Sequence, residues 1–170
     1  MPLRYVDPAR RTTAVSRALT RFGRSRAGQT FGRNVVVRTD RLLLRVSNGR
    51  VSWGMLNAPS ATLKMTGAKT AQPREATISY FHDGRDVILI ASNFGGDRHP
   101  QWYYNLVSHP NCELGGEAFR AAAVTEPAEY ARLYALAERS YPGYSDYKAK
   151  TALVGRTIPV FRLTPLAGGG

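Results

Sequence analysis

The residues best suited to chemistry lie in the stretch 66–74, T-G-A-K-T-A-Q-P-R, a connection just before a strand-like run. Glycine lets the backbone approach a ligand closely, and successive amide groups can converge on phosphate oxygens. Lys69 and Arg74 can add charge-assisted hydrogen bonds to the same anion. The stretch predicts an anion cradle, and the alternative is a solvated basic loop of the kind common on protein surfaces.

The rest of the chain shows no set of residues that would form a catalytic machine unaided. Ser92 has no histidine and acid partner evident from the sequence, and Cys112 lies in a strand-like run that favours a buried, inert thiol. His82, His99 and His109 lack the paired spacing of a metal site, so we expect no metal. An anion cradle and many aromatic residues, without reactive groups, suit a redox cofactor that brings the reactive atom itself.

Composition is that of one globular domain with a strong positive charge. The 170 residues carry a formal net charge of +12, which implies an anionic partner: nucleic acid, an anionic membrane surface or a multiply charged cofactor. Most aromatic residues sit in periodic, core-like positions, so we expect no nucleic acid. A lone cysteine excludes an intramolecular disulfide, and no apolar run approaches the roughly 20 residues that span a bilayer. These features predict a cytoplasmic protein.

The N-terminal segment 1–28 predicts a basic amphipathic helix and a flexible joint. Asp7 can cap a helix whose first position is Pro8. The apolar residues Val15, Ala18, Leu19 and Phe22 then recur at helical spacing. Arginines lie roughly opposite this apolar stripe. Three hypotheses stay open, namely docking on the domain, disorder, and attachment to an anionic membrane surface at the inner face of the cell membrane. We expect a ligand-binding domain over 29–165 and a flexible tail over 166–170.

The remaining pattern predicts an antiparallel sheet with helical insertions. Strand-like runs cover 61–65, 77–81, 87–91, 112–114, 117–124 and 158–163. Asp83-Gly84 and Gly115-Gly116 are hairpin signals. Helices are expected around 100–108 and from about residue 125. No helix alternates regularly with the strands, which favours an α+β barrel with helices packed outside over a doubly wound parallel sheet.

Three motifs together resemble the deazaflavin-dependent nitroreductase family, whose members hold coenzyme F420 in a split β-barrel of the FMN-binding type. They are T-G-A-K-T-x-Q-P-R, then A-S-N-x-G-G-D-R-H-P-x-W-Y-x-N-L, and Y-P-x-Y-x-D-Y followed by R-T-I-P-V. The resemblance runs from about Leu42 to Leu163. It also favours a helix in the run from Val35 to Val46, which periodicity alone leaves ambiguous between helix and strand.

The resemblance implies a set of cofactor-binding residues in four segments. Lys69 and Arg74 would hold the phosphodiester and glutamyl tail of F420, and backbone amides of a strand edge would line its ring and ribityl portions. The full set is Ala68, Lys69, Thr70, Arg74, Glu75, Ala76, Thr77, Ile78, Ser79, Ile90, Ala91, Ser92, Asn93, Gln101, Trp102, Tyr103, Tyr104 and Asn105. For Trp102, a core anchor is the competing interpretation.

Two residues match the catalytic positions that the resemblance implies. Tyr144 would orient the acceptor, and its phenol could donate a hydrogen bond as negative charge develops. Ser92 could hydrogen-bond the ring system. Tyr141, Tyr144 and Tyr147 are spaced three apart, so on a helix they would fan over one side and could wall a pocket.

The chain departs from the family pattern at three positions. Ala71 stands where a glycine is usual, so we expect φ below zero there. Asn93 and Phe94 replace small or basic residues, and Phe94 would intrude on the cofactor or substrate side.

These residues predict an oxidoreductase that binds reduced coenzyme F420 and transfers hydride to an electron-poor acceptor, a quinone, an enone or a nitroaromatic compound. One alternative is an FMN-dependent reductase or oxidase on the same barrel. Another is a non-catalytic, membrane-associated module that binds a cofactor.

Overall fold

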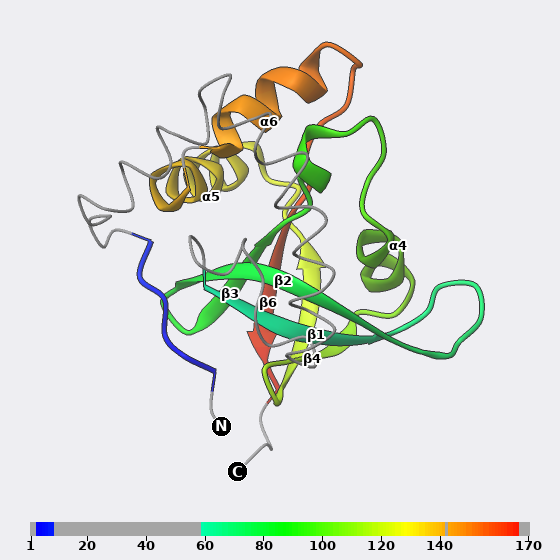
Figure 1. Cartoon of the computed structure of the whole chain (residues 1–170). Coiled ribbons are helices and arrows are strands. Elements are labelled where there is room, and N and C mark those ends of the chain that lie inside the picture. Colours follow the sequence, from blue (N-terminus) through cyan, green and yellow to red (C-terminus); the bar gives the residue numbers. More distant parts are fainter. Residues whose placement is uncertain (1–2, 9–58, 142, 167–170) are drawn as a thin grey trace, which may run out of the picture. The chain divides into compact units, whose positions relative to one another are not determined.

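Six antiparallel strands form a closed barrel among the described residues (Figure 1). The computed structural model describes residues 3–8, 59–141 and 143–166. The strands are β1 (Ser60–Thr66), β2 (Pro73–Asp83), β3 (Asp86–Ile90), β4 (Asn111–Leu114), β5 (Glu117–Ala123) and β6 (Val160–Pro165). Buried and exposed residues alternate along strands such as β5, so that one face of the strand points into the barrel. Their order is β1-β2-β3-β6-β5-β4, and β4 pairs with β1 to close the ring. The predicted antiparallel barrel is confirmed.

Two-residue turns join β2 to β3 and β4 to β5, as the hairpin signals predict. Asp83 pairs with Asp86 across the first turn, and Leu114 pairs with Glu117 across the second. Gly115 and Gly116 adopt φ of 59° and 93°. Two successive positive φ values match the right-handed twist of the flanking strands, and glycine adopts them without steric cost.

Strand β3 is buried on both faces and so separates two parts of the core. Val87 and Leu89 belong to the cluster that fills the barrel, together with residues such as Phe119 and Phe161. Ile88 and Ile90 point to the other face and pack under the helices. Because successive strand residues face opposite sides, burial on both faces explains the uninterrupted apolar run at 87–90.

Helices lie outside the barrel, as predicted (Figure 1). They are α4 (Gln101–Ser108), α5 (Pro127–Ser140) and α6 (Gly143–Ala152), and a short 3-10 turn, η3 (Asn93–Gly95), follows β3. Helix α5 begins where the side chain of Glu126 accepts a hydrogen bond from the N–H of Ala128 at 2.9 Å. A cap of this kind satisfies a donor that the first helical turn leaves unpaired.

Ion pairs fasten α5 to the barrel. Asp83, in β2, accepts hydrogen bonds from Arg132 of α5 at 2.6 and 3.0 Å and from Arg162 of β6 at 3.0 Å. Arg162 also binds Asp86 at 2.7 Å and contacts Glu129 of α5. Hydrogen bonds from Arg132 lower the pKa of both Asp83 and Glu129. The network therefore holds the first half of α5 against the β2–β3 hairpin and β6.

The described N-terminal residues 3–8 lie along the barrel as an extended segment. Val6 donates its N–H to Nδ1 of His82 at 3.1 Å, and its carbonyl accepts from the N–H of His82 at 2.8 Å. Leu3 donates its N–H to Glu117 at 2.7 Å. The predicted helix in 1–28, apart from residues 3–8, and the ambiguous run 35–46 lie outside the described residues. None of the described helices is long and apolar enough to cross a membrane.

His82 should make the folded barrel lose stability in mild acid. It is 8% exposed, and burial lowers its pKa. Its stabilising effect is therefore complete above the unfolded-state pKa of about 6.5 and is lost as pH falls from there through the lower folded-state value. Protonation places a hydrogen on Nδ1, which can then no longer accept from Val6.

His82→Asn tests this prediction, because its side-chain oxygen can accept the same bond without titrating. Between pH 7.5 and 5.0 the wild type should lose about 1 kcal/mol more of its free energy of unfolding than the variant, the usual net value of one hydrogen bond. Urea titrations at both pH values measure this difference. An equal loss in the two proteins would show that His82 does not set the pH dependence.

Candidate active site

The turn between β1 and β2 is closed by its own backbone. Gly67 donates its N–H to the carbonyl of Gln72 at 2.8 Å, and Ala71 donates to the carbonyl of Gly67 at 2.9 Å. A Cβ on Gly67 would lie 3.0 Å from Oγ1 of Thr70 and 3.2 Å from the carbonyl oxygen of Gln72. Close approach therefore favours glycine at 67, and the turn is a compact loop at the end of a long hairpin.

The expectation that Ala71 has φ below zero is wrong. Its φ is 54°, the left-handed region that glycine adopts easily and that costs other L-residues roughly 1–2 kcal/mol. Closure of the turn through the bond from Ala71 to Gly67 places the residue in this conformation. Alanine thus adopts, at a cost in backbone strain, a conformation that the usual glycine would adopt freely.

Helix α4 supports the turn through a side-chain hydrogen bond. Asn105, 4% exposed, accepts a hydrogen bond from the N–H of Ala68 at 3.0 Å. One turn earlier on the helix, the ring of Trp102 packs at 5.8 Å from that of Phe161 in the barrel core. Figure 1 shows the β1–β2 connection extending beyond α4. Trp102 is partly buried and packs against the barrel core, and α4 fixes both the turn and the residues beside it.

A cavity of about 400 Å³ lies between this turn, the start of β2 and α4. It brings together many of the residues predicted to bind the cofactor, includes Gly67 of the predicted anion cradle, and adds Met65, which the sequence did not single out. Its lining is Met65, Gly67, Ala68, Lys69, Thr70, Arg74, Glu75, Ala76, Gln101, Trp102 and Asn105.

The cavity carries two cations. Lys69 and Arg74 are exposed, and within the described part of the chain neither forms an ion pair with a carboxylate. Arg74 donates a hydrogen bond to Oγ1 of Thr70 at 3.4 Å, a long contact that an anion could replace. Glu75 is the acidic residue of the lining. The arrangement can bind a chain of negative charges along the hairpin.

Strand β2 presents a backbone edge next to the cavity. Its residues Pro73 to Ser79 pair with β1, whereas pairing with β3 begins only at Tyr80. Among the described strands, one edge of this segment therefore has no ladder partner. The expectation that backbone amides of a strand edge line the ring of F420 needs such an open edge. Ile78 is buried in the core, and the hydroxyl of Ser79 lies 3.1 Å from that of Ser60. Thr77, Ile78 and Ser79 do not line the cavity.

The segment after β3 forms a second part of the candidate site. Ile90 and Ala91 are buried, so their side chains belong to the core, while Ser92 and Asn93 lie at η3. Ser92 caps the turn with its carbonyl, which accepts from the N–H of Gly95 at 3.0 Å. The structure thus places these predicted residues outside the cavity described above, at the end of β3 and on the loop that leads from it to α4.

Arg156, whose role the sequence did not reveal, holds this loop. Its guanidinium donates to the carbonyls of Ala91 at 2.6 Å, Ser92 at 3.0 Å and Gly96 at 2.7 Å. Its Nε donates to Nδ1 of His99 at 3.1 Å. All four partners are uncharged acceptors spread over nine residues, a pattern that no local sequence signal predicts. The R-T-I-P-V motif begins at this arginine, so membership of that motif was the sequence signal that could have pointed to Arg156.

Aromatic contacts connect the two parts of the site. The ring of His99 lies 4.3 Å from that of Tyr103, which in turn is 5.7 Å from Phe161. Phe161 also contacts Trp102, which lines the cavity. Tyr104 is exposed and meets Tyr103 edge to face at 5.1 Å. A continuous set of packed rings therefore runs from the cavity to the Arg156-held loop.

The three tyrosines of the predicted fan do meet, but only Tyr144 and Tyr147 lie on α6, whereas Tyr141 is the C-terminal cap of α5 in extended backbone. Tyr144 meets Tyr141 at 5.5 Å and Tyr147 at 6.1 Å, both edge to face. Its carbonyl accepts a hydrogen bond from the hydroxyl of Tyr134 at 3.0 Å, which ties α6 to α5. Burial raises the pKa of Tyr144 to about 12, so its phenol is protonated at neutral pH. It can therefore donate a hydrogen bond.

A family model for F420H(2)-dependent quinone reductases matches residues 36–165. The chain belongs to this family. An F420H(2)-dependent quinone reductase of Mycobacterium tuberculosis strain H37Rv is 36% identical over 129 residues, which are 72% of this chain and 85% of that protein. The resemblance in the three motifs is confirmed, and the chain is an F420H2-dependent reductase whose cofactor is reduced coenzyme F420.

Solved structures agree with the barrel. A structure described as an F420-H2 dependent reductase superposes with a TM-score of 0.53 and 28% identity, covering 62% of this chain and 93% of that one. A second, described as a domain-swapped dimer, gives 0.55 and 28% identity, covering 74% of this chain and 93% of that one. Both likenesses place this F420H2-dependent reductase on the split barrel that the sequence predicted.

The residues present fit coenzyme F420. The cofactor carries an anionic phosphodiester and glutamyl tail and a flat ring system, so it needs cations at one end and an apolar or hydrogen-bonding surface at the other. Lys69 and Arg74 supply positive charge that no carboxylate of the described residues pairs, beside a turn in which a Cβ at Gly67 would crowd Thr70 and Gln72. Trp102 adds an aromatic wall.

Proposed function

We propose that this F420H2-dependent reductase holds the tail of F420 in the cavity beside the β1–β2 turn and reduces a quinone next to the tyrosine fan. The observation that carries the proposal is the pairing of a cation-lined cavity with a protonated phenol, Tyr144. Packed rings run from the cavity to His99 on the loop that Arg156 holds, and Phe94 of the same loop meets Tyr147 of the fan. The family description, which names quinones, supports the acceptor class.

Lys69 and Arg74 would bind the tail phosphate and carboxylates, with the backbone of the turn beside them. Net charge of +12 adds a long-range field that draws a polyanionic cofactor toward the protein. Asn105 acts indirectly in this proposal, since its side-chain oxygen is already bonded to Ala68 and so holds the turn in place. The open edge of β2 and Ser92 would line the ring.

When bound, reduced F420 supplies a hydride, and a quinone that takes this hydride and one proton becomes the hydroquinone. Tyr144 would donate a hydrogen bond to the quinone oxygen as its negative charge grows, which lowers the energy of the transition state. Its high pKa suits this role, because the phenol gives a hydrogen bond at neutral pH without losing its proton. Tyr141 and Tyr147 would pack around it and limit the access of water.

Enones and nitroaromatic compounds are the other acceptors that the sequence predicts. Each also develops negative charge on an oxygen during reduction, so the same phenol would serve them. The proposed function does not require the protein to bind a membrane. The hypothesis of an anionic membrane surface concerns segment 1–28, of which residues 3–8 are described, and it stays a prediction.

Initial rates of F420H2 oxidation with a naphthoquinone, a cyclic enone and a nitroaromatic compound test the acceptor class. We expect kcat/KM for the quinone to exceed the other two by about tenfold or more, the size of discrimination that differences in a few contacts produce. An enone or nitroaromatic compound that surpasses every quinone tried would refute the proposed acceptor class and leave the cofactor assignment intact.

A further inference from the structure

The turn η3 holds an aromatic side chain in solvent on a strained backbone. Asn93, Phe94 and Gly95 have φ of 47°, 54° and 75°, three successive residues in the left-handed region. For a bulky residue such as Phe94 this conformation is a genuine outlier. Its side chain is 81% exposed, so it gains little burial in return. Strain of this kind persists only where the surroundings impose it, and it is concentrated at functional sites.

The surroundings impose it from two sides. On one side, Arg156 binds the carbonyls of Ala91, Ser92 and Gly96, which flank the turn. On the other, a Cβ on Gly95 would lie 3.2 Å from Cα of Tyr147, so α6 presses directly on the turn. Neither contact involves the ring of Phe94. The fold therefore fixes the backbone that presents the ring and leaves most of the ring itself uncovered.

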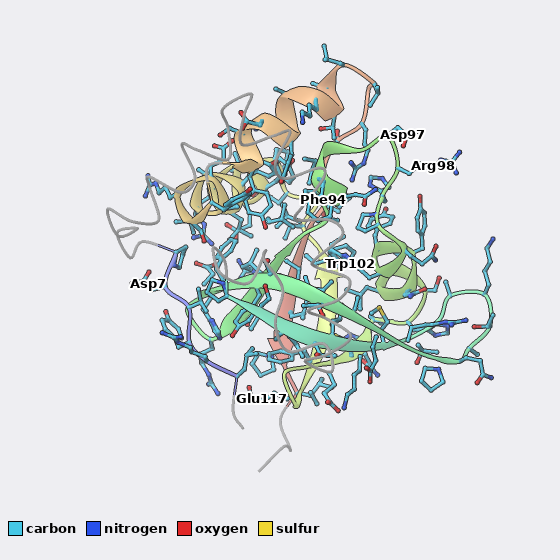
Figure 2. All side chains as sticks on the ribbon, viewed as in Figure 1. Asp7, Phe94, Asp97, Arg98, Trp102 and Glu117 are labelled. Carbon is cyan, nitrogen blue, oxygen red and sulfur yellow. The ribbon has the colours of Figure 1, made fainter. Side chains whose placement is uncertain are left out.

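The ring of Phe94 is aimed at the tyrosine fan. It meets Tyr147 edge to face at 6.2 Å, and Tyr147 in turn contacts Tyr141 and Tyr144. In Figure 2, Phe94 lies on the segment between β3 and α4, on the side of the barrel that carries α6. An exposed aromatic ring at the rim of an aromatic cluster can bury itself against a flat or apolar ligand bound there.

We propose that Phe94 is a specificity-determining residue that contacts the acceptor, favouring acceptors that carry an apolar substituent beside the reducible ring. Arg156 is its positioning residue, because it fixes the loop from which the ring projects. The proposal rests on the proposed function in that it takes the tyrosine fan as the acceptor side. It goes further by assigning a preference among acceptors to Phe94, a residue that departs from the family pattern.

The test compares two quinones that differ only in an apolar side chain, a 2-methyl naphthoquinone with and without a prenyl substituent. Binding to the protein loaded with oxidised F420 is measured by calorimetry, and kcat/KM is measured with reduced F420. Phe94→Ala should weaken the affinity for the prenylated quinone about fivefold to thirtyfold, the range for one lost aromatic contact, and change that for the plain quinone less than about twofold. Affinity for F420 should stay unchanged.

Phe94→Gly is the matched control for backbone strain. Glycine relieves the positive φ and also lacks the ring, so it should melt at a higher temperature than Phe94→Ala yet discriminate between the quinones equally poorly. Equal quinone affinities in wild type and Phe94→Ala, or an equal loss for both quinones, would overturn the proposal. A wild type that binds the quinones but does not reduce them would refute the proposed function. The ratio of the affinities for the two quinones would still test the role of Phe94.

A double-mutant cycle tests the role of Arg156. Lysine cannot reproduce the fork that reaches three carbonyls, so Arg156→Lys should reduce discrimination between the two quinones in the wild-type background. In the Phe94→Ala background the same substitution should change the ratio less than about twofold, because the residue it positions is gone. A full additional loss there would show that Arg156 does not act through Phe94. If Arg156→Lys fails to fold, the Phe94 variants decide.

Discussion

Replacing Tyr144 by phenylalanine is expected to lower turnover roughly tenfold to a thousandfold while leaving the affinity for F420 nearly unchanged. The substitution keeps the ring that packs against Tyr141 and Tyr147 and removes only the hydroxyl. The bond from Tyr134 goes to the backbone carbonyl of residue 144 and is preserved. Steady-state kinetics at saturating F420H2, with a quinone as acceptor, measure the effect.

Tyr141→Phe and Tyr147→Phe are the matched controls, because these tyrosines belong to the same fan. Burial and a hydrogen bond with Tyr141 raise the pKa of Tyr147, so the two hydroxyls are partners of each other. Their loss should alter turnover much less than loss of the Tyr144 hydroxyl. Wild-type turnover by Tyr144→Phe with several acceptors would show that Tyr144 only walls the pocket and that another group or solvent supplies the hydrogen bond to the acceptor oxygen.

Removing charge from Lys69 or Arg74 should weaken F420 binding roughly tenfold to a hundredfold, with little change in turnover at saturating cofactor. The physical reason is the loss of one charge-assisted contact to the tail, about 1.5 to 3 kcal/mol, far from the reacting atoms. Lys69→Gln and Arg74→Gln, titrated with F420 and followed by calorimetry, provide the measurement.

Lys64→Gln is the control for net charge. Lys64 lies on the neighbouring strand β1 and pairs with Glu113 at 2.8 Å, outside the cavity lining. It changes the long-range field by the same one unit without touching the proposed tail site. Wild-type F420 affinity in both cavity variants, or an equal loss in Lys64→Gln, would remove Lys69 and Arg74 from the site.

Much of the barrel could be predicted from local signals. Turn residues at Asp83-Gly84 and Gly115-Gly116 marked two hairpins, and the strand-like runs overlapped all six described strands. Strand β2 proved longer than its apolar part, starting at Pro73 rather than Thr77. Its first residues are polar and exposed and pair only with β1, so nothing in their hydrophobicity announces a strand.

The arrangement of the candidate site depended on long-range contacts that composition does not encode. Lys69 and Arg74 stood out because charge and glycine are adjacent in sequence. Arg156 did not, since its partners are backbone carbonyls some sixty residues away and any residue type provides a carbonyl. Ala71 was predicted with the wrong φ because its side chain suggested ordinary backbone, whereas closure of the turn decided the conformation.

Parallel titration of the purified protein with F420 and with FMN tests the central claim most directly. The account predicts that F420 binds at least about a hundredfold more tightly, since its longer anionic tail reaches Lys69 and Arg74 beside the β1–β2 turn. Added salt should narrow the difference, because these cations are exposed and their attraction is screened. FMN binding that equals or exceeds F420 binding would contradict the account, because the cavity would then not be selecting the deazaflavin tail.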